Sequence, residues 1–399
     1  EFALVYANID RFKLVNELYG DEKGDRVLRQ VHKVIDNELL SWDEASGRIM
    51  ADNFGMLLRF HSMKKLEHRL NRLNEQLGHL CDEQGVSYGL RLFFGVYLVT
   101  DKEMPVSAMM ERANLALKKT LQLPQHLKKI GVYDEKEHQK LEREKHLEMR
   151  MEQALKNGEF VPYLQPKYEL THETIAGAEA LVRWVSPEEG MIFPGEFIPL
   201  FEKNGFIVEL DLYMFEQVCK MIESWHKNGY RIIPVSVNMS RGHFLVPNFF
   251  DRYKEILERY DVPKGSIEIE LTESLFLNEI STMTDLVNKI HEVGLRCSID
   301  DFGSGYSSLN MLKDIKVDAL KLDRVFFVKT EEDKRGKDII NSILHLAQNL
   351  HLKTISEGVE IRSQVEYLKE MDCDYIQGYV FAKPMPVKDF VKIAFAKSV

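Results

Sequence analysis

Short apolar segments alternate with amphipathic helical segments through the carboxyl-terminal part of this chain, and this alternation is what most limits its possible fold. "IIPVSVN" precedes "FFDRYKEILERY", and "SIEIELTE" precedes "TDLVNKIHEVG". The series continues with "RCSIDD", "VDALKLD", "LKTISEG" and "CDYIQGY". Repeated β/α units over roughly 250 residues favour a (β/α)₈ barrel over an open sheet.

The amino-terminal part lacks this regular alternation. Residues 1–133 mix apolar strands with helical patterns near residues 25–40 and 106–121, which predicts an α+β domain. At 399 residues the chain exceeds what one hydrophobic core usually serves, so we expect two domains. A charged helix over residues 134–157, with Leu147, Met151 and Leu155 on one face, would connect them, and the second domain would span residues 147–399.

The charge of the chain limits its partners. With 63 Asp and Glu against 53 Lys and Arg, the net charge is -10, which argues against the broad basic footprint of proteins that bind DNA or RNA polymers. A small anionic ligand held in a local pocket or by a metal ion stays compatible with this charge. The four cysteines lie far apart without a CxxC pair, so reduced core thiols are favoured over disulfides or a zinc site.

The sequence shows neither a signal peptide nor an apolar run long enough to cross a bilayer, which predicts a cytoplasmic location. The chain opens within "FALVYANIDRF" without an initiator Met. We therefore expect a longer parent protein, whose preceding part could hold a membrane anchor or a sensor.

A polar or charged residue stands at the end of each predicted barrel strand, where burial of apolar surface does not explain it. An earlier strand, "AGAEALVRW", also carries Glu179 inside an apolar run. For one residue alone, a helix cap or a buried ion pair is the simpler explanation. Successive barrel strands, however, end on the one face where active sites of this fold lie. The strand-end residues are Asn238, Glu270, Asp300, Asp301, Lys321, Glu357 and Gln377.

The residue types of this set indicate a metal site. Carboxylates and an amide, without Cys or His, suit Mg²⁺ or Mn²⁺ better than Zn²⁺, and their charge is sufficient for two divalent cations. Two such ions can activate a water and hold a phosphate oxygen, as in many phosphodiester hydrolases. Lys321 could stabilise charge on the phosphate or orient the attacking water, and a salt bridge to Asp300 or Asp301 is compatible with either role.

These segments resemble the EAL family of bacterial cyclic-di-GMP phosphodiesterases. The resemblance rests on "AEALVRW", "YLQP", "FIPLFEKNGFI", "SVNMS", "ELTES", "IDDFGSGYSSL", "LKLDR", "SEGVE" and "QGYVFAKP". It implies hydrolysis of cyclic-di-GMP to linear pGpG with two divalent cations, a homodimer formed through this domain, and a (β/α)₈ variant whose first strand runs antiparallel. A receptor that binds cyclic-di-GMP without cleaving it is the alternative, although such receptors usually lose part of the metal set.

The resemblance also implies roles for single residues. Lys321 and Glu357 match residues near the attacking water and the second metal, and with Glu179 and Asp301 they form the implied catalytic set. Gln165 and Arg183 match residues that contact the dinucleotide, and Gln377 matches a further active-site position. Glu273, Gly303 and Gly305 match a loop that couples metal binding to dimer formation. The implied metal ligands are Glu179, Asn238, Glu270, Asp300 and Asp301.

The front domain resembles the GGDEF family of diguanylate cyclases through "NIDRFKLVNELYGDEKGDRVL" and the hairpin "GRIMADNFGMLLRF". Its signature is altered, because Gly-Gly-Asp-Glu-Phe becomes Met50-Ala51-Asp52-Asn53-Phe54 and Asn8 replaces a metal-binding carboxylate. The resemblance therefore predicts a domain that does not make cyclic-di-GMP, and disfavours a bifunctional enzyme. Asn16 and Asp25 match guanine-binding positions, so they are either turn and cap residues or part of a weak regulatory GTP site.

Overall fold

The computed structural model describes residues 1–81, 87–122, 129–276, 280–303, 309–327 and 334–396. The chain forms two compact units, Glu1–Arg143 and Glu144–Val399, which are described separately. Helix α5, Glu135–Lys156, contains the division between them. Among the described residues, none of the helices combines the length and the apolar character needed to cross a bilayer.

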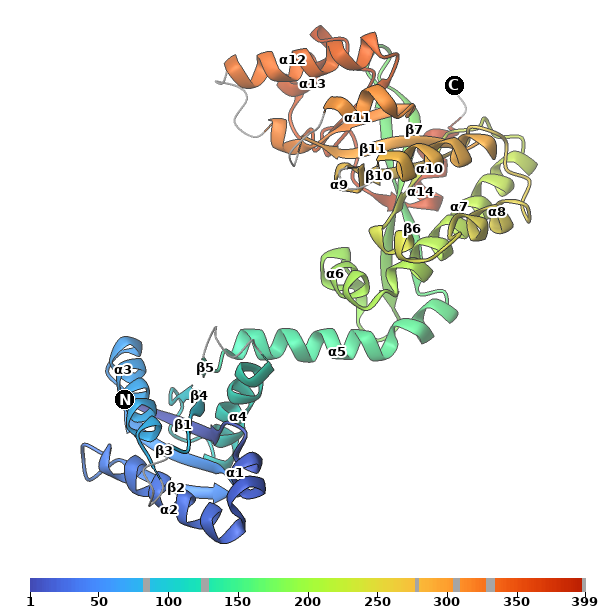
Figure 1. Ribbon diagram of the computed structural model, residues 1–399. Helices are drawn as coiled ribbons and strands as arrows, with labels where there is room; N and C mark the ends of the chain where they lie inside the picture. The colour runs from blue at the N-terminus through green and yellow to red at the C-terminus, as the bar shows by residue number, and fades with distance from the viewer. Residues whose placement is uncertain (82–86, 123–128, 277–279, 304–308, 328–333, 397–399) are drawn as a thin grey trace. The chain divides into compact units, whose positions relative to one another are not determined.

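The first unit is a five-stranded sheet in the order β2-β3-β1-β4-β5, covered by helices (Figure 1). Its strands are antiparallel except for the β4–β5 pair, which is parallel. The strands are β1 Phe2–Ile9, β2 Ala45–Met50, β3 Asn53–Arg59, β4 Leu92–Leu98 and β5 Ile130–Val132. The helices are α1 Phe12–Tyr19, α2 Asp21–Asn37, α3 Met63–Gly78 and α4 Val106–Gln122.

Alternation along β1 explains why this sheet has helices on both faces. Ala3, Val5 and Ala7 belong to the larger core cluster, with residues of α2 and α3. Leu4 lies in a second cluster with Met109 and Ala113 of α4. Successive side chains of a strand point to opposite faces, so one strand supplies both cores. The predicted α+β class is confirmed, although α2 begins earlier than the expected residue 25 and α1 and α3 were not expected.

The second unit contains a closed barrel. Six neighbouring pairs from β7 through β14 are parallel, and β6 closes the barrel by pairing antiparallel with both β7 and β14. The barrel strands are β6 Phe160–Glu169, β7 Thr174–Ser186, β9 Val235–Met239, β10 Ile267–Thr272, β11 Arg296–Phe302, β12 Ala319–Leu322, β13 Lys353–Glu357 and β14 Tyr375–Gln377. Short strands β8, Gly190–Ile192, and β15, Met385–Pro386, extend this sheet.

The antiparallel first strand follows from the length of its connection. Residues 170–173 join β6 to β7, and a turn this short can only join antiparallel strands, whereas parallel strands need a long crossover. The parallel strands do have helical crossovers, which cover the barrel (Figure 1). They are α6 Pro194–Asn204, α7 Ile207–Lys227, α8 Phe250–Leu257, α9 Glu273–Phe276, α10 Ile280–Glu292, α11 Leu309–Asp314, α12 Lys334–Asn349 and α13 Arg362–Glu370, with α14 Val387–Ala394 at the end and 3-10 turns η1 Arg241–Leu245 and η2 Arg324–Phe327. Both the (β/α)₈ prediction and the antiparallel strand implied by the resemblance are confirmed.

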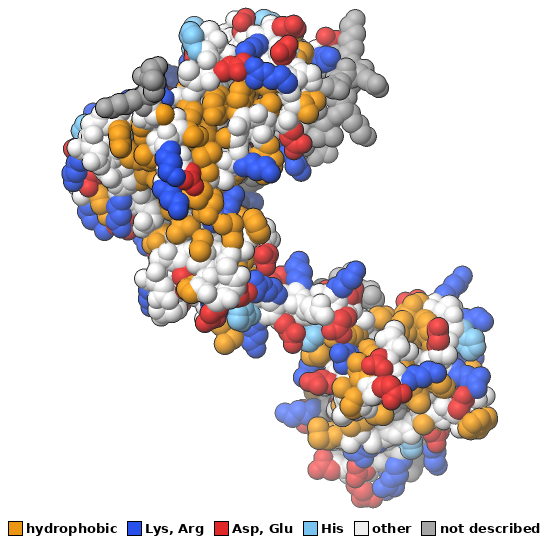
Figure 2. All heavy atoms as spheres, turned by 180° about the vertical axis from the view of Figure 1, so that it is seen from behind, with side chains coloured by type: hydrophobic (Ala, Val, Ile, Leu, Met, Phe, Trp, Pro, Cys, Tyr) orange, Lys and Arg blue, Asp and Glu red, His pale blue; other side chains and the backbone are white. Residues whose placement is uncertain are grey.

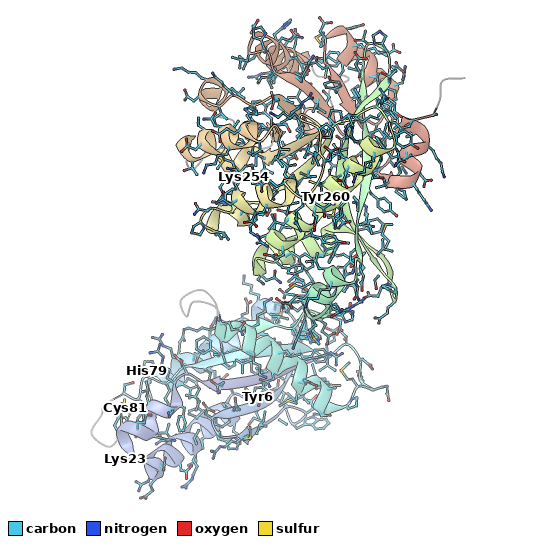
Figure 3. The ribbon with its side chains drawn as sticks, turned by 90° about the vertical axis from the view of Figure 1, so that its right-hand side faces the viewer. Tyr6, Lys23, His79, Cys81, Lys254 and Tyr260 are labelled. Carbon is cyan, nitrogen blue, oxygen red and sulfur yellow. The ribbon has the colours of Figure 1, made fainter. Side chains whose placement is uncertain are left out.

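Apolar packing fixes the barrel against its helices. Phe160 of β6, Trp184 of β7 and Phe201 of α6 are fully buried and contact one another through their rings. The predicted stripe of α5 packs against the same core, with Leu147 fully buried and Met151 and Leu155 partly buried. Farther out, Lys254 of α8, labelled in Figure 3, lies over the ring of Phe250.

Candidate active site

The predicted strand-end residues gather at one end of the barrel because β9 to β14 run in the same direction. The register pairs Asn238 with Glu270 and Glu357 with Gln377 on neighbouring strands. Glu179 joins them from β7, where it lies opposite Gln165 of β6. Most of the set is buried, Asp301 and Glu357 are half-buried, and Asn238 is exposed.

Lys321 of β12 lies at the centre of this set. Its Nζ is 2.6 Å from Glu270 Oε2, 2.7 Å from Glu357 Oε1, 2.9 Å from Asp300 Oδ1 and 3.5 Å from Glu179 Oε2. The side chain of Lys321 is 1% exposed, so these carboxylates provide the charge compensation that water cannot. Burial would lower the pKa of Lys321, but the surrounding carboxylates hold it well above its usual range.

The ammonium group of Lys321 cannot neutralise all of these carboxylates. Their pKa values therefore shift in different directions. Burial would raise the pKa of Glu270, but Lys167 and Lys321 hold it below its usual range. Burial and the nearby Glu270 raise the pKa of Glu179. Burial raises the pKa of Glu357 to about 8, in spite of Lys321. Without another cation, a pKa of about 8 therefore keeps Glu357 mostly protonated at neutral pH.

A backbone irregularity brings two consecutive carboxylates together. In a regular strand Asp300 and Asp301 would point to opposite faces. The register of β11 against β12 shifts between Ile299 and Phe302, and Asp301 has a φ of 54°, in the left-handed region. One oxygen each of Asp300, Asp301 and Glu357 consequently lie within 4.8 Å of one another, close enough to share a metal ion. Such strain in a non-glycine residue is typical of functional sites.

Amide side chains fix the orientation of Glu179. Asn238 Nδ2 donates to Glu179 Oε1 at 2.9 Å, and Gln377 Nε2 donates to Glu179 Oε2 at 2.5 Å. Gln377 Nε2 also lies 3.2 Å from Gln165 Oε1, so residues from four strands form one network. Arg183, four residues beyond Glu179 on β7, lies over the ring of Tyr163 at 5.6 Å.

Two cavities adjoin the cluster. One, of about 480 Å³, is lined by Asp301, Glu273 and the segment after β9 that contains Ser240 and Arg241. The other, of about 330 Å³, is lined by Glu179 and Glu357 together with Gln165, Leu181, Arg324, Gln377 and Tyr379. Both cavities are lined by carboxylates of the cluster but by different strands. A ligand bound over these carboxylates could therefore extend into both cavities.

Glu273, at the start of α9, contacts the described beginning of the predicted loop. The buried Oε2 of Glu273 accepts a hydrogen bond from the backbone N–H of Gly303 at 2.8 Å. Gly303 has a φ of 92°, and a Cβ there would lie 2.0 Å from the Phe326 ring, so another residue would be strained and would displace that ring. Gly305 lies outside the described residues.

Sequence reasoning missed a charged layer beneath this site. Lys167 of β6 is buried, and its Nζ lies 2.9 Å from Glu270 Oε1 and 3.5 Å from Glu268 Oε1. The signal was available in "YLQPKYEL", since a lysine two residues after Gln165 points to the same face of the strand.

The corresponding site of the first unit has different chemistry. Asn8 pairs with Asn53 across β1 and β3, and Asn8 Nδ2 donates to Asn53 Oδ1 at 3.0 Å. Asp52 lies in the β2–β3 turn, where Ala51 adopts a φ of 52° and Met50 is 68% exposed. Burial and Asp52 raise the pKa of Tyr6, which Figure 3 shows on the sheet. Within the described residues, the groupings of three or more potential metal ligands do not include this turn.

Comparison with known proteins agrees with this architecture. The EAL domain family matches residues 148–384, more than half of the chain. The chain belongs to the EAL family. The diguanylate cyclase GGDEF domain family matches residues 1–125, so a GGDEF domain precedes the EAL domain, as the two resemblances predicted.

Several curated relatives match nearly the whole chain. It is 29% identical over 385 residues to the cyclic di-GMP phosphodiesterase NbdA of Pseudomonas aeruginosa, a match that covers 96% of this chain and 49% of NbdA. It is 30% identical over 393 residues to the cyclic di-GMP phosphodiesterase PdeR of Escherichia coli, covering 97% of this chain and 58% of PdeR. The chain thus spans about half the length of the curated relatives it matches.

A solved structure also resembles the EAL domain. The PaMucR phosphodiesterase, in its c-di-GMP complex, is 33% identical with a TM-score of 0.58, and the match covers 61% of this chain and 99% of that one. A second, the cAMP-bound EAL enzyme Bd1971, is 26% identical with a TM-score of 0.59, covering 77% of this chain and 82% of the other.

Proposed function

We propose that the EAL domain hydrolyses one phosphodiester bond of cyclic-di-GMP and releases linear pGpG. The observation that carries this proposal is the convergence of Glu179, Glu270, Asp300 and Glu357 on the buried Lys321, with Asp301 beside Asp300 and Glu357. Relatives that are named cyclic di-GMP phosphodiesterases, and the PaMucR complex with c-di-GMP, supply the identity of the substrate.

The donor set fits divalent cations. Several carboxylates surround one ammonium group, and burial raises the pKa values of Glu179 and Glu357, so added positive charge would favour their ionised forms. All candidate ligands are oxygen atoms, which favours Mg²⁺ or Mn²⁺. We propose that Glu179, Asn238, Glu270, Asp300 and Asp301 hold two cations, with Glu357 beside the second.

Bound cations would lower the pKa of a coordinated water and neutralise charge on the phosphate. The reaction adds the water oxygen to phosphorus, breaks the bond to one ribose 3′ oxygen, and leaves a 5′-phosphate and a 3′ hydroxyl. Lys321, which also contacts Asp300 and Glu357, would orient the attacking water or stabilise charge on the phosphate oxygens. Gln165, Arg183 and Gln377 would hold the dinucleotide, whose two halves would extend into the cavities beside the cluster.

The GGDEF domain, by contrast, is proposed not to synthesise cyclic-di-GMP. Asn8 and Asn53 satisfy each other by a hydrogen bond, and neutral amides are weak ligands for a cation. Asp52 alone would supply too little charge for Mg²⁺ on a nucleoside triphosphate. Two expectations from the resemblances are tested separately: a weak regulatory GTP site involving Asn16 and Asp25, and an EAL homodimer.

The test is to incubate the purified chain with cyclic-di-GMP and Mg²⁺ or Mn²⁺, with and without GTP, and to separate the products by chromatography. We expect metal-dependent pGpG, which chelation abolishes. Tight binding of the dinucleotide without product under either metal would contradict the proposal and identify a receptor. Calorimetry with millimolar GTP tests the regulatory site, and light scattering tests the dimer.

A further inference from the structure

The charged layer beneath the active site centres on Lys167, whose side chain is enclosed by the barrel. Its side chain is 7% exposed, and its Nζ lies 2.9 Å from both Ser236 Oγ and Glu270 Oε1. A weaker contact of 3.5 Å joins it to Glu268 Oε1, which also accepts a hydrogen bond from Ser298. Lys167 therefore contacts one carboxylate of the active site and one outside it.

Glu270 is held at both of its oxygens. Lys167 contacts Oε1 and Lys321 contacts Oε2, and the Glu270 side chain is 0% exposed. The two lysines differ, because Lys321 is shared with Glu179, Asp300 and Glu357, whereas the other partners of Lys167 lie in the layer below. Cations bound at the cluster could take the place of Lys321 at Oε2, while Lys167 keeps hold of Oε1.

Packing alone does not explain a lysine at this position. Barrel interiors are usually filled by branched apolar side chains, and a buried ion pair often contributes less to stability than an apolar replacement. Lys167, Ser236 and Glu268 also line a cavity of about 420 Å³ that extends to Arg296, Asp318 and Lys353 near the beginnings of the strands. This layer is thus not densely packed, and packing does not account for its charged residues. We therefore consider a functional role for them.

We propose that Lys167 is a positioning residue, which holds Oε1 of Glu270 so that Oε2 faces the divalent cations. The inference rests on the proposed function, because it assumes that those divalent cations bind at the cluster. Removing a residue that orients a metal ligand typically weakens metal affinity by about 10- to 100-fold. Coulomb's law alone predicts the opposite, since removing a nearby positive charge would tighten the binding of a cation.

The experiment compares Mn²⁺ binding by three forms of the full chain after chelator treatment. Glu268→Gln keeps the contact between Lys167 and Glu270, so we expect affinity within about twofold of the unmodified chain. Lys167→Met combined with Glu268→Gln removes one charge of each sign, which avoids an unpaired carboxylate. We expect this double variant to bind Mn²⁺ about 10- to 100-fold more weakly by calorimetry.

A second measurement separates positioning from general damage. The Mn²⁺ concentration for half-maximal hydrolysis should rise about 10- to 100-fold in the double variant, while KM for cyclic-di-GMP at saturating Mn²⁺ stays within about twofold. Lys353→Met is the matched control, because Lys353 lines the same cavity but pairs with Asp374 at 2.6 Å. It should leave Mn²⁺ affinity unchanged.

Equal or tighter Mn²⁺ binding by a folded double variant would overturn the inference. If Lys167→Met does not fold, Lys167→Gln, whose shorter amide falls short of Glu270, removes the same contact. Failure of both to fold would assign Lys167 a structural role and also overturn the inference. An unmodified chain that binds Mn²⁺ without hydrolysis refutes the proposed function alone, whereas one that binds no Mn²⁺ refutes both.

Discussion

The EAL and GGDEF domains each present polar residues at strand ends, but the hydrogen-bonding needs of these residues are met in different ways. In the GGDEF domain, Asn8 and Asn53 hydrogen bond to each other, because an amide is both donor and acceptor. In the EAL domain the ionised carboxylates can only accept, so they cannot satisfy one another. Lys321 satisfies part of this demand, while burial, and after it the neighbouring carboxylates, raise the pKa values of Glu179 and Glu357.

Under the proposed functions, this difference in unresolved charge would separate the active domain from the inactive one. A site whose polar groups satisfy each other is complete without a ligand, whereas a cluster of carboxylates is stabilised by added cations. On the face drawn in Figure 2, acidic and basic side chains are interspersed in both units, so the contrast lies in the sites and not in that surface.

Chelation should have the largest effect and tests the comparison most directly. We expect EDTA to abolish hydrolysis completely, because the EAL carboxylates would then lack the charge that activates water, and Mg²⁺ or Mn²⁺ should restore it. The release of pGpG, followed by chromatography before and after metal addition, measures this. Hydrolysis that persists in excess chelator would show that Lys321 alone is sufficient.

Removing single carboxylates of the cluster should have the next largest effect. We expect Glu179→Ala and Asp300→Ala each to lower kcat/KM by about a thousandfold, equivalent to about 4 kcal/mol of transition-state stabilisation. Steady-state kinetics at saturating metal measures the loss. Asp389→Ala is the matched control, because this carboxylate pairs with Lys392 on the surface at 2.8 Å. Activity within tenfold of normal in both cluster variants would contradict the proposed ligand set.

The unresolved charge should also make stability depend on pH. Burial raises the pKa of Glu357 from 4.5 to about 8, and burial and Asp300 raise the pKa of Asp301 from 3.8 to about 6. The folded state holds these protons to a higher pH than the unfolded chain, so their contribution to stability is complete below about pH 4 and is lost as the pH rises to about 8.

We therefore expect the Tm of chelator-treated protein to fall by several degrees between pH 5 and pH 8, at roughly 2–4 °C per kcal/mol. Saturating Mn²⁺ should flatten this dependence, because the cations replace the protons. Glu270, with its lowered pKa, and Lys321, with its raised pKa, act outside this window. Differential scanning fluorimetry measures the Tm at each pH. An equal change of Tm with pH in the presence and absence of Mn²⁺ would count against a cation site.

The smallest effect is expected in the GGDEF domain. Asp52→Ala should leave hydrolysis of cyclic-di-GMP within about twofold, because surface substitutions away from a functional site usually change little. The same kinetic assay, with and without GTP, measures it. Loss of hydrolysis in this variant would mean that the two domains do not divide their roles as the comparison states.

Local patterns in the sequence were sufficient for much of the fold. The alternation of strands and helices predicted the barrel, and the apolar stripe of α5 was correctly identified from Leu147, Met151 and Leu155. The start of α2 was misplaced because Gly20, with a φ of 81°, ends α1 and Asp21 begins the next helix at once. Helices α1 and α3 were not predicted.

The sequence by itself determined which chemical groups stand at the strand ends and which positions of the GGDEF signature are altered, because residue identity and periodicity are local properties. Only the tertiary structure decided the partners of Lys321 and Lys167. Glu179 lies 142 positions from Lys321, and Glu270 lies 103 from Lys167, and these pairs meet only because the barrel closes in one register. The left-handed backbone of Asp301, at the shift in register between β11 and β12, was likewise visible only in the structure.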